Sequence, residues 1–128
     1  MAEKGIVILD TNVLIEIIRR NVEVIQICDK IGTENLAISS ISRSEFLLGS
    51  RDKENFEKNR KFADKFSLLR TNNFVDEIFT ELYETFSLSH RPAIPDMLIA
   101  ATTIHYNAHL YTLNTRDFRF INNLKLYS

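Results

Sequence analysis

The spacing of apolar residues changes several times along the chain, and each change marks the boundary of a predicted element. Gly5–Leu9 is a short, continuous apolar run with β-branched residues, which indicates a buried strand. Thr11–Arg20 then switches to helical spacing, with its apolar residues on one side: Val13, Leu14, Ile17 and Ile18. A strand that passes directly into an amphipathic helix is typical of α/β proteins.

The same alternation of strands and helices continues to the end of the chain. The pattern predicts helices over Val22–Ile31, Ser42–Gly49, Asp52–Phe66, Asn73–Ser87 and Asp96–Tyr106. It predicts strands over Leu36–Ser39, Ser67–Arg70, Leu110–Leu113 and Lys125–Tyr127, the last a short edge strand, with a loop over His90–Ile94 and a turn over Asn114–Phe118. We therefore expect an α/β fold, a three-layer α/β/α sandwich with a central, mainly parallel sheet.

Composition limits the class of protein without naming it. The 128 residues, of which 45% are hydrophobic and 26% charged, predict a single domain over residues 1–128 with one substantial core. The only cysteine, Cys28, lies among isoleucines and is expected to be a core residue in a reducing compartment. The N-terminal apolar run is too short for a signal peptide, and no stretch is long enough to span a membrane. We expect a cytoplasmic location.

The charge balance gives no sign of a nucleic-acid-binding protein. The formal net charge is −1 and the pI is about 6.3. One segment, residues 51–66, is rich in basic residues and could be an RNA-facing or partner-facing arm, or equally an ordinary solvated helix. An acidic site acting on a polyanion would need metal ions to offset its charge.

Four acidic residues lie at the junctions between predicted elements. Asp10 ends the first strand, and Asp117 lies just beyond the fourth. Glu45 and Asp96 lie in the predicted first turns of two helices, Asp96 directly after Pro95. Because parallel strands bring their carboxyl ends to one edge of the sheet, these carboxylates can converge there.

Convergent carboxylates repel one another, and a divalent cation removes that cost. Ligands that are all oxygen favour a hard ion such as Mg²⁺ or Mn²⁺ over zinc. A carboxylate-held Mg²⁺ can bind phosphate oxygens, lower the pKa of a water molecule and stabilise a leaving oxygen, as phosphodiester hydrolysis requires.

Each acid also has a purely structural explanation. Asp10 could cap the helix that follows it, and Glu45 could form a capping box with Ser42. Asp96 could complement the dipole of its helix, and Asp117 could be a turn residue. Their common position at one predicted sheet edge weighs against four separate explanations.

Four sequence motifs resemble those of the PIN-domain family, and most closely its VapC branch, the toxins of type II toxin–antitoxin modules. They are ILDTNVLI at 8–15, SRSEFLLGS at 42–50, IPDMLIAAT at 94–102 and LYTLNTRDF at 110–118. The motifs stand in the family's order and span nearly the whole chain.

The resemblance implies an α/β/α sandwich, dependence on Mg²⁺ (with Mn²⁺ as a substitute) and cleavage of single-stranded RNA. It also implies a cognate antitoxin and a homodimer. It assigns the family's acids to Asp10, Glu45 and Asp96, and the fourth acid to Asp117, since Asn114, where some relatives carry it, has no charge. Asp10, Asp96 and Asp117 are then the expected metal ligands, and the expected supporting residues are Thr11, Asn12, Thr112 and Asn114.

Several other residues lie beside these motifs. Three arginines could contact backbone phosphates or be ordinary surface residues: Arg43, Arg91 and Arg116. The nearest histidine, His90, is expected to be structural rather than a general acid.

Competing interpretations remain. An aspartyl-nucleophile phosphatase would need a second Asp where Asn12 stands, and the motifs do not match a receiver domain. A catalytically silent PIN-like binding module and a housekeeping RNA-processing nuclease both stay open.

Overall fold

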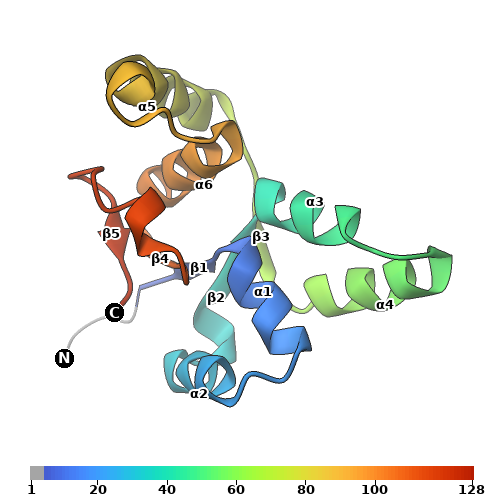
Figure 1. Ribbon diagram of the computed structural model, residues 1–128. Coiled ribbons are helices and arrows are strands. Elements are labelled where there is room, and N and C mark those ends of the chain that lie inside the picture. Colours follow the sequence, from blue (N-terminus) through green and yellow to red (C-terminus); the bar gives the residue numbers. More distant parts are fainter. Residues whose placement is uncertain (1–4) are drawn as a thin grey trace.

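The computed structural model describes residues 5–128, and a five-stranded sheet lies at the centre of that region (Figure 1). The strands are β1 (Val7–Leu9), β2 (Leu36–Ser39), β3 (Ser67–Leu69), β4 (His109–Tyr111) and β5 (Lys125–Leu126). They are arranged in the order β3-β2-β1-β4-β5, and every neighbouring pair is parallel. The predicted parallel sheet is confirmed, including the late edge strand.

Helices cover both faces of this sheet. They are α1 (Thr11–Ile18), α2 (Val22–Ile31), α3 (Ser40–Leu48), α4 (Lys53–Ala63), α5 (Asn73–His90) and α6 (Ile94–His105). Figure 1 shows α5 and α6 on one side of the sheet and α1 to α4 on the other, so the three-layer α/β/α prediction is confirmed. Over residues 5–128, no helix combines the length and the apolar character needed to cross a bilayer.

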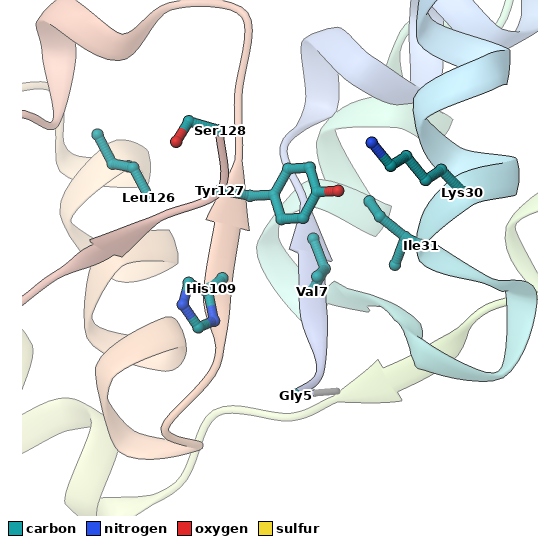
Figure 2. Close-up of a pocket in the computed structure, with 8 residues that line it drawn as sticks. All are labelled: Gly5, Val7, Lys30, Ile31, His109, Leu126, Tyr127 and Ser128. Atoms are coloured by element: carbon teal, nitrogen blue, oxygen red, sulfur yellow. The ribbon is translucent and has the colours of Figure 1, made fainter. Parts of the chain in front are cut away.

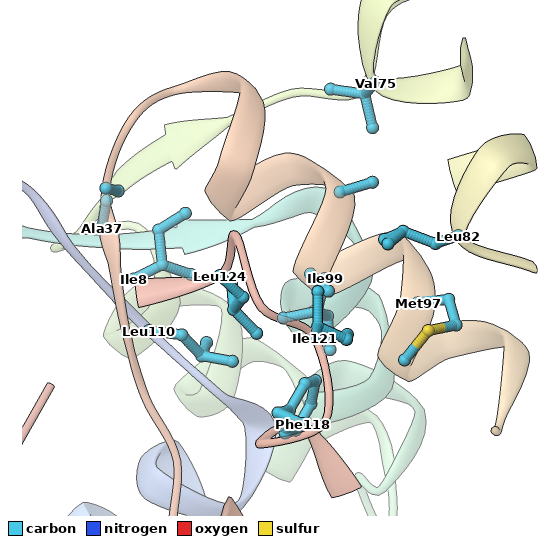
Figure 3. Close-up of a cluster of buried hydrophobic side chains, with 13 residues drawn as sticks. Ile8, Ala37, Val75, Leu82, Met97, Ile99, Leu110, Phe118, Ile121 and Leu124 are labelled. Atoms are coloured by element: carbon cyan, nitrogen blue, oxygen red, sulfur yellow. The ribbon is translucent and has the colours of Figure 1, made fainter. Parts of the chain in front are cut away.

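Alternation of side chains along the strands builds two separate cores. Ile8 of β1 packs with β4 and the α5–α6 layer, in the cluster shown in Figure 3. Its neighbours Val7 and Leu9 point to the opposite face and pack with α1, α2 and α3. Cys28 is buried in this second core, as predicted. A strand buried on both faces must be apolar throughout, which explains the continuous run that begins the sequence.

The order of the strands creates a switch point beside β1. The chain first places β2 and β3 on one side of β1, then returns through α5 and α6 to place β4 on the other side. In parallel sheets of this kind, ligands bind outside the carboxyl ends of the strands at the point where the direction of winding reverses. The crevice between the ends of β1 and β4 is therefore the position where a site is expected.

The start of α3 corrects the predicted capping box. The helix begins at Ser40, and the side chain of Ser39 caps it by accepting a hydrogen bond from the Ser42 amide at 3.0 Å. Glu45 therefore lies in the second turn, too far along to reach the cap, and the predicted pairing of Ser42 with Glu45 is wrong. The reason is that β2 ends at Ser39 and the chain enters the helix without a loop.

The predicted loop over His90–Ile94 is shorter than expected. Helix α5 continues through His90, whose ring stacks on Phe120 with 4.1 Å between centroids and also contacts Phe86. The helix ends at Arg91, whose φ of 45° lies in the left-handed region, and the loop is reduced to residues 91–93. A tertiary contact thus extends the helix beyond the point that its spacing predicts, and the structural role expected for His90 fits this packing.

Candidate active site at the carboxyl ends of β1 and β4

Asp10 is held rigidly at the end of β1. Its amide donates to the Tyr111 carbonyl of β4 at 2.9 Å, which extends the ladder by one residue. One carboxylate oxygen accepts from the Thr11 amide at 2.8 Å and the other from the Thr112 hydroxyl at 2.7 Å. Asp10 therefore does cap α1, as its structural explanation proposed. The same contacts hold its carboxylate in one orientation, so capping and ligand binding are compatible.

Burial gives this carboxylate an unusual electrostatic environment. Only 6% of the Asp10 surface is exposed. Burial raises the pKa of Asp10, the hydrogen bonds from Thr112 and Thr11 oppose that rise, and the charges of Glu45 and Asp117 add to it. The raised pKa means that the hydrogen bonds from Thr112 and Thr11 do not fully offset the cost of burying the charged carboxylate.

Polar residues after β4 tie the two strand ends together. The Thr112 hydroxyl accepts from the Asn114 amide at 3.0 Å while it donates to Asp10. Asn12 bridges from α1 by accepting from the Leu113 amide at 3.2 Å. Its side-chain amide donates to Thr112 at 3.4 Å. The positions predicted to support the site thus form one hydrogen-bonded network.

Asp117 and Asn114 occupy the same side of the site. Asp117 lies in a short 3₁₀ turn (Thr115–Asp117), and the Asn114 side-chain amide donates to its carboxylate at 2.5 Å. The two residues are therefore hydrogen-bonded partners, and the Asn114 amide fixes the orientation of the Asp117 carboxylate.

Glu45 reaches the site from the side. It lies on the flank of α3 that faces α1, where it accepts a hydrogen bond from the Thr11 hydroxyl at 2.6 Å. Thr11 thus contacts two acids, Asp10 through its amide and Glu45 through its hydroxyl.

Asp96 differs from the other acids because no hydrogen bond to its carboxylate is found over residues 5–128. It lies in the first turn of α6, whose second residue is Pro95, as predicted. Burial, followed by the charges of Asp10, Asp117 and Glu45, raises the pKa of Asp96 to about 6. Asp96 has negatively charged neighbours and no hydrogen-bond donor within residues 5–128, so a nearby cation would stabilise its ionised form.

All four acids line one open pocket of about 310 Å³, together with Thr11, Asn12, Asn114, Ile15 and Phe118. Over residues 5–128, no three acidic, histidine or cysteine side chains lie close enough together to enclose an ion directly. The spread fits Mg²⁺, which keeps several waters and commonly uses only one or two carboxylates. Every polar group of the pocket that could bind a metal offers oxygen, the donor that hard cations prefer.

The sequence did not single out two residues of this pocket. Ile15, one helical turn beyond Thr11, forms an apolar wall, and the buried ring of Phe118 packs beside Asp117. The helical spacing from Thr11 could have indicated Ile15, whereas Phe118 could not be placed without the turn that precedes it.

A second hollow lies at the opposite, amino-terminal edge of the strands (Figure 2). It is lined by Gly5, Val7, Lys30, Ile31, His109, Leu126, Tyr127 and Ser128. Its side chains combine three aliphatic groups with one lysine, one imidazole, one phenol and one serine hydroxyl, and none of them is a carboxylate. The chemistry expected from the sequence therefore gathers at the other end of the sheet.

Several solved structures similar to this chain are of VapBC proteins or of a toxin–antitoxin complex. VapBC2 from Rickettsia felis, bound to a promoter DNA fragment, contains a chain 27% identical to this one, with a TM-score of 0.81 and coverage of 95% of this chain and 97% of that one. VapBC from Salmonella typhimurium gives 22% identity, a TM-score of 0.83 and coverage of 96% and 97%. A toxin–antitoxin complex from Klebsiella pneumoniae gives 24% identity, a TM-score of 0.78 and coverage of 92% and 94%. At 22% and 24% identity, the last two structures support the fold alone.

Sequence comparison gives the family. No curated protein matches the chain. The profile of the PIN domain, however, matches residues 7–123, which include the four acids and all the residues bonded to them. The chain therefore belongs to the PIN domain family.

Proposed function

We propose that this protein is a Mg²⁺-dependent endoribonuclease that cleaves single-stranded RNA, and that it is the toxin of a type II toxin–antitoxin module. The observation that supports the proposal best is the gathering of Asp10, Glu45, Asp96 and Asp117 in one pocket at the switch point of the sheet. Membership of a family of nucleases and the likeness to VapBC structures point the same way.

The residues of the pocket divide into three roles. Asp10 and Asp96 would hold the ion and Asp117 would support the site, with Asp96 the most direct ligand because its carboxylate accepts no hydrogen bond from the described residues. Such an ion, Mg²⁺ or Mn²⁺, would neutralise the phosphodiester and ease deprotonation of the attacking water. Glu45 would orient that water, since its position beside Thr11 leaves one carboxylate oxygen without a partner among the described residues. Thr112 and Asn114 would keep Asp10 and Asp117 in place.

Loss of single carboxylates tests the assignment. Asp10→Asn and Asp96→Asn should each reduce Mg²⁺-dependent RNA cleavage by at least about a hundredfold, because each removes a ligand charge while keeping its shape. Asp76→Asn is the matched control, since Asp76 lies in the first turn of α5 but is exposed and remote from the pocket. Circular dichroism would verify folding. Full activity in both site variants would refute the assignment, and inactivity of the wild type on varied RNAs with Mg²⁺ or Mn²⁺ would favour a silent binding module.

The toxin role concerns a protein partner. The crowded carboxylates would also attract a cationic side chain, so we propose that a cognate antitoxin inserts a C-terminal segment over the pocket, where Ile15 offers an apolar contact. The partner should be encoded by a small neighbouring reading frame for a DNA-binding protein. Its absence, together with growth unaffected by induction, would favour a housekeeping nuclease.

Co-expression tests this partner directly. The antitoxin should block cleavage, and Ile15→Asn should weaken the complex because it replaces the apolar contact with an uncharged polar side chain. A complex that leaves Asp10 and Asp96 accessible to solvent would contradict the insertion. We also propose a homodimer, which light scattering of the purified protein would reveal as twice the chain mass.

A further inference from the structure

We propose that a hollow on the far flank of α3, built around Arg43 and Arg70, binds a backbone phosphate of the RNA two or three nucleotides from the scissile bond. The inference rests on the proposed ribonuclease function. The hollow has a volume of about 370 Å³ and is lined by Arg43, Asp64, Arg70, Ala63, Phe66 and Leu68.

The Arg70 end of the hollow lies at the same edge of the sheet as the acidic pocket. Leu69 is the last residue of β3 and pairs in register with Ser39, the last of β2, so Arg70 lies just past the carboxyl end of its strand. Strands β3 and β1 are separated by β2 alone. Two strand spacings amount to about 10 Å. At roughly 3.4 Å per stacked nucleotide, and more where the strand is extended, two or three nucleotides cover that span.

Helix α3 divides the two hollows. Arg43 and Glu45 are two residues apart, about 200° around the helix. Their contacts confirm opposite flanks, since Glu45 bonds Thr11 of α1 while Arg43 pairs with Asp64 at the end of α4 (Figure 1). An RNA strand that joins the two hollows would cross the amino-terminal end of α3, where the helix dipole favours a phosphate group.

The charges around the hollow favour an anion. Asp64 is shared between Arg43 at 2.9 Å and Arg60 at 3.5 Å. The Arg43 guanidinium still has donors to spare, since it carries five N–H groups and uses one of them on Asp64. Arg70 is exposed and, over residues 5–128, forms no ion pair within 4.0 Å.

The position of Arg70 is fixed through its backbone. The Tyr106 hydroxyl, at the end of α6, donates to the Arg70 carbonyl at 2.8 Å. This contact anchors the chain where β3 ends while the guanidinium stays available for a ligand. A cation held at the edge of an acidic site, in a chain whose net charge is −1, is positioned to offset repulsion between the RNA and the carboxylates.

Binding of uncleaved RNA tests the phosphate site. The probe is a fluorescent, mixed-sequence, 12-nucleotide single-stranded RNA, titrated with protein in EDTA and followed by anisotropy at several salt concentrations. Arg70→Gln should weaken binding roughly tenfold and reduce the slope of log K against log salt by about 0.7, the value for one phosphate contact on a single strand. Arg70→Gln together with Arg43→Gln should reduce the slope by about 1.4. Arg20→Gln is the control, because Arg20 follows the opposite end of α1 from Asp10.

Different results would refute the phosphate site and the ribonuclease activity. If wild type cleaves RNA with Mg²⁺ but Arg70→Gln binds the probe with the affinity and salt slope of Arg20→Gln, the phosphate site is refuted and the ribonuclease stands. If wild type cleaves no RNA, the proposed function fails on its own evidence. Arg70→Gln removes no ion pair within residues 5–128 and leaves the Arg43–Asp64 contact intact, so a binding defect in that variant reports on Arg70 itself.

Discussion

Asp96→Asn should stabilise the protein in the absence of divalent cations, although it removes a proposed metal ligand. Burial and three neighbouring acids raise the pKa of Asp96 from an ordinary value of 3.8 to about 6. The folded state therefore binds this proton more tightly than the unfolded state. At neutral pH the group is ionised in both states, and its charge costs folding free energy that the neutral amide of asparagine does not.

The shift sets the size of the effect. About two pKa units correspond to about 3 kcal/mol, and solvent screening of this partly exposed carboxylate reduces the cost to about 1–2 kcal/mol. Asparagine also gives up a favourable charge at the helix N-terminus, worth about 0.3–1 kcal/mol. A net gain of about 1 kcal/mol remains, which for a chain of this length is a rise of about 4 °C in Tm.

Thermal unfolding of both proteins in EDTA at pH 7.5 and pH 5.0 measures the effect. The advantage of Asp96→Asn should be largest at pH 7.5 and should shrink at pH 5.0, because wild-type Asp96 takes up its proton as the pH falls through about 6. At pH 7.5, millimolar Mg²⁺ should stabilise the wild type and close the gap. The exposed Asp76→Asn should lose a few tenths of a kcal/mol at both pH values, since it loses only the dipole interaction. A lower Tm for Asp96→Asn in EDTA, or a difference independent of pH, would refute the reasoning.

Three further predictions concern single side chains. Thr112→Val should lower the free energy of unfolding in urea by about 1.5–3 kcal/mol and reduce cleavage about 10- to 100-fold, because it leaves an oxygen of buried Asp10 without its donor. Thr112→Ser, which keeps the hydroxyl, should restore both the stability and the cleavage rate. Ser39→Ala should lower the free energy of unfolding by about 1 kcal/mol because α3 loses its cap. Ser42→Ala should leave that free energy unchanged or raise it, since the buried Ser42 hydroxyl has no partner among the described residues. Equal losses of stability in the two variants would contradict this assignment of the cap. Cys28 should resist alkylation at pH 8 until the protein is unfolded, because burial raises its pKa to about 11; rapid labelling of the native protein would contradict that environment.

The sheet could be predicted from the sequence because its strands are buried on both faces. Val7, Ile8 and Leu9 must all be apolar when alternate residues enter two different cores. The parallel order then brings Asp10 and the residues after β4 to one edge, whatever the exact bounds of each element. The convergence of the acids follows from topology rather than from local detail.

Local boundaries were harder to predict because they depend on contacts between distant residues. Three serines stand near the start of α3, at 39, 40 and 42, and any of them could cap a helix. The choice of Ser39 depends on where β2 ends, which its pairing with β3 determines. In the same way, α5 extends to His90 because its ring stacks on Phe120, thirty residues away in the sequence.

The four acids are therefore unequal, and their inequality has a physical order. Asp10 is fixed by two hydrogen bonds and caps a helix, so a neutral asparagine at this position keeps part of its structural role and tests its charge alone. Asp117 and Glu45 each have one polar partner. Asp96 accepts no hydrogen bond within residues 5–128 and carries the pKa that crowding and burial raise to about 6. Because the charge of Asp96 costs more stability than the helix dipole returns, we propose that a bound cation offsets the difference, which makes the stability of Asp96→Asn as informative about the site as its activity.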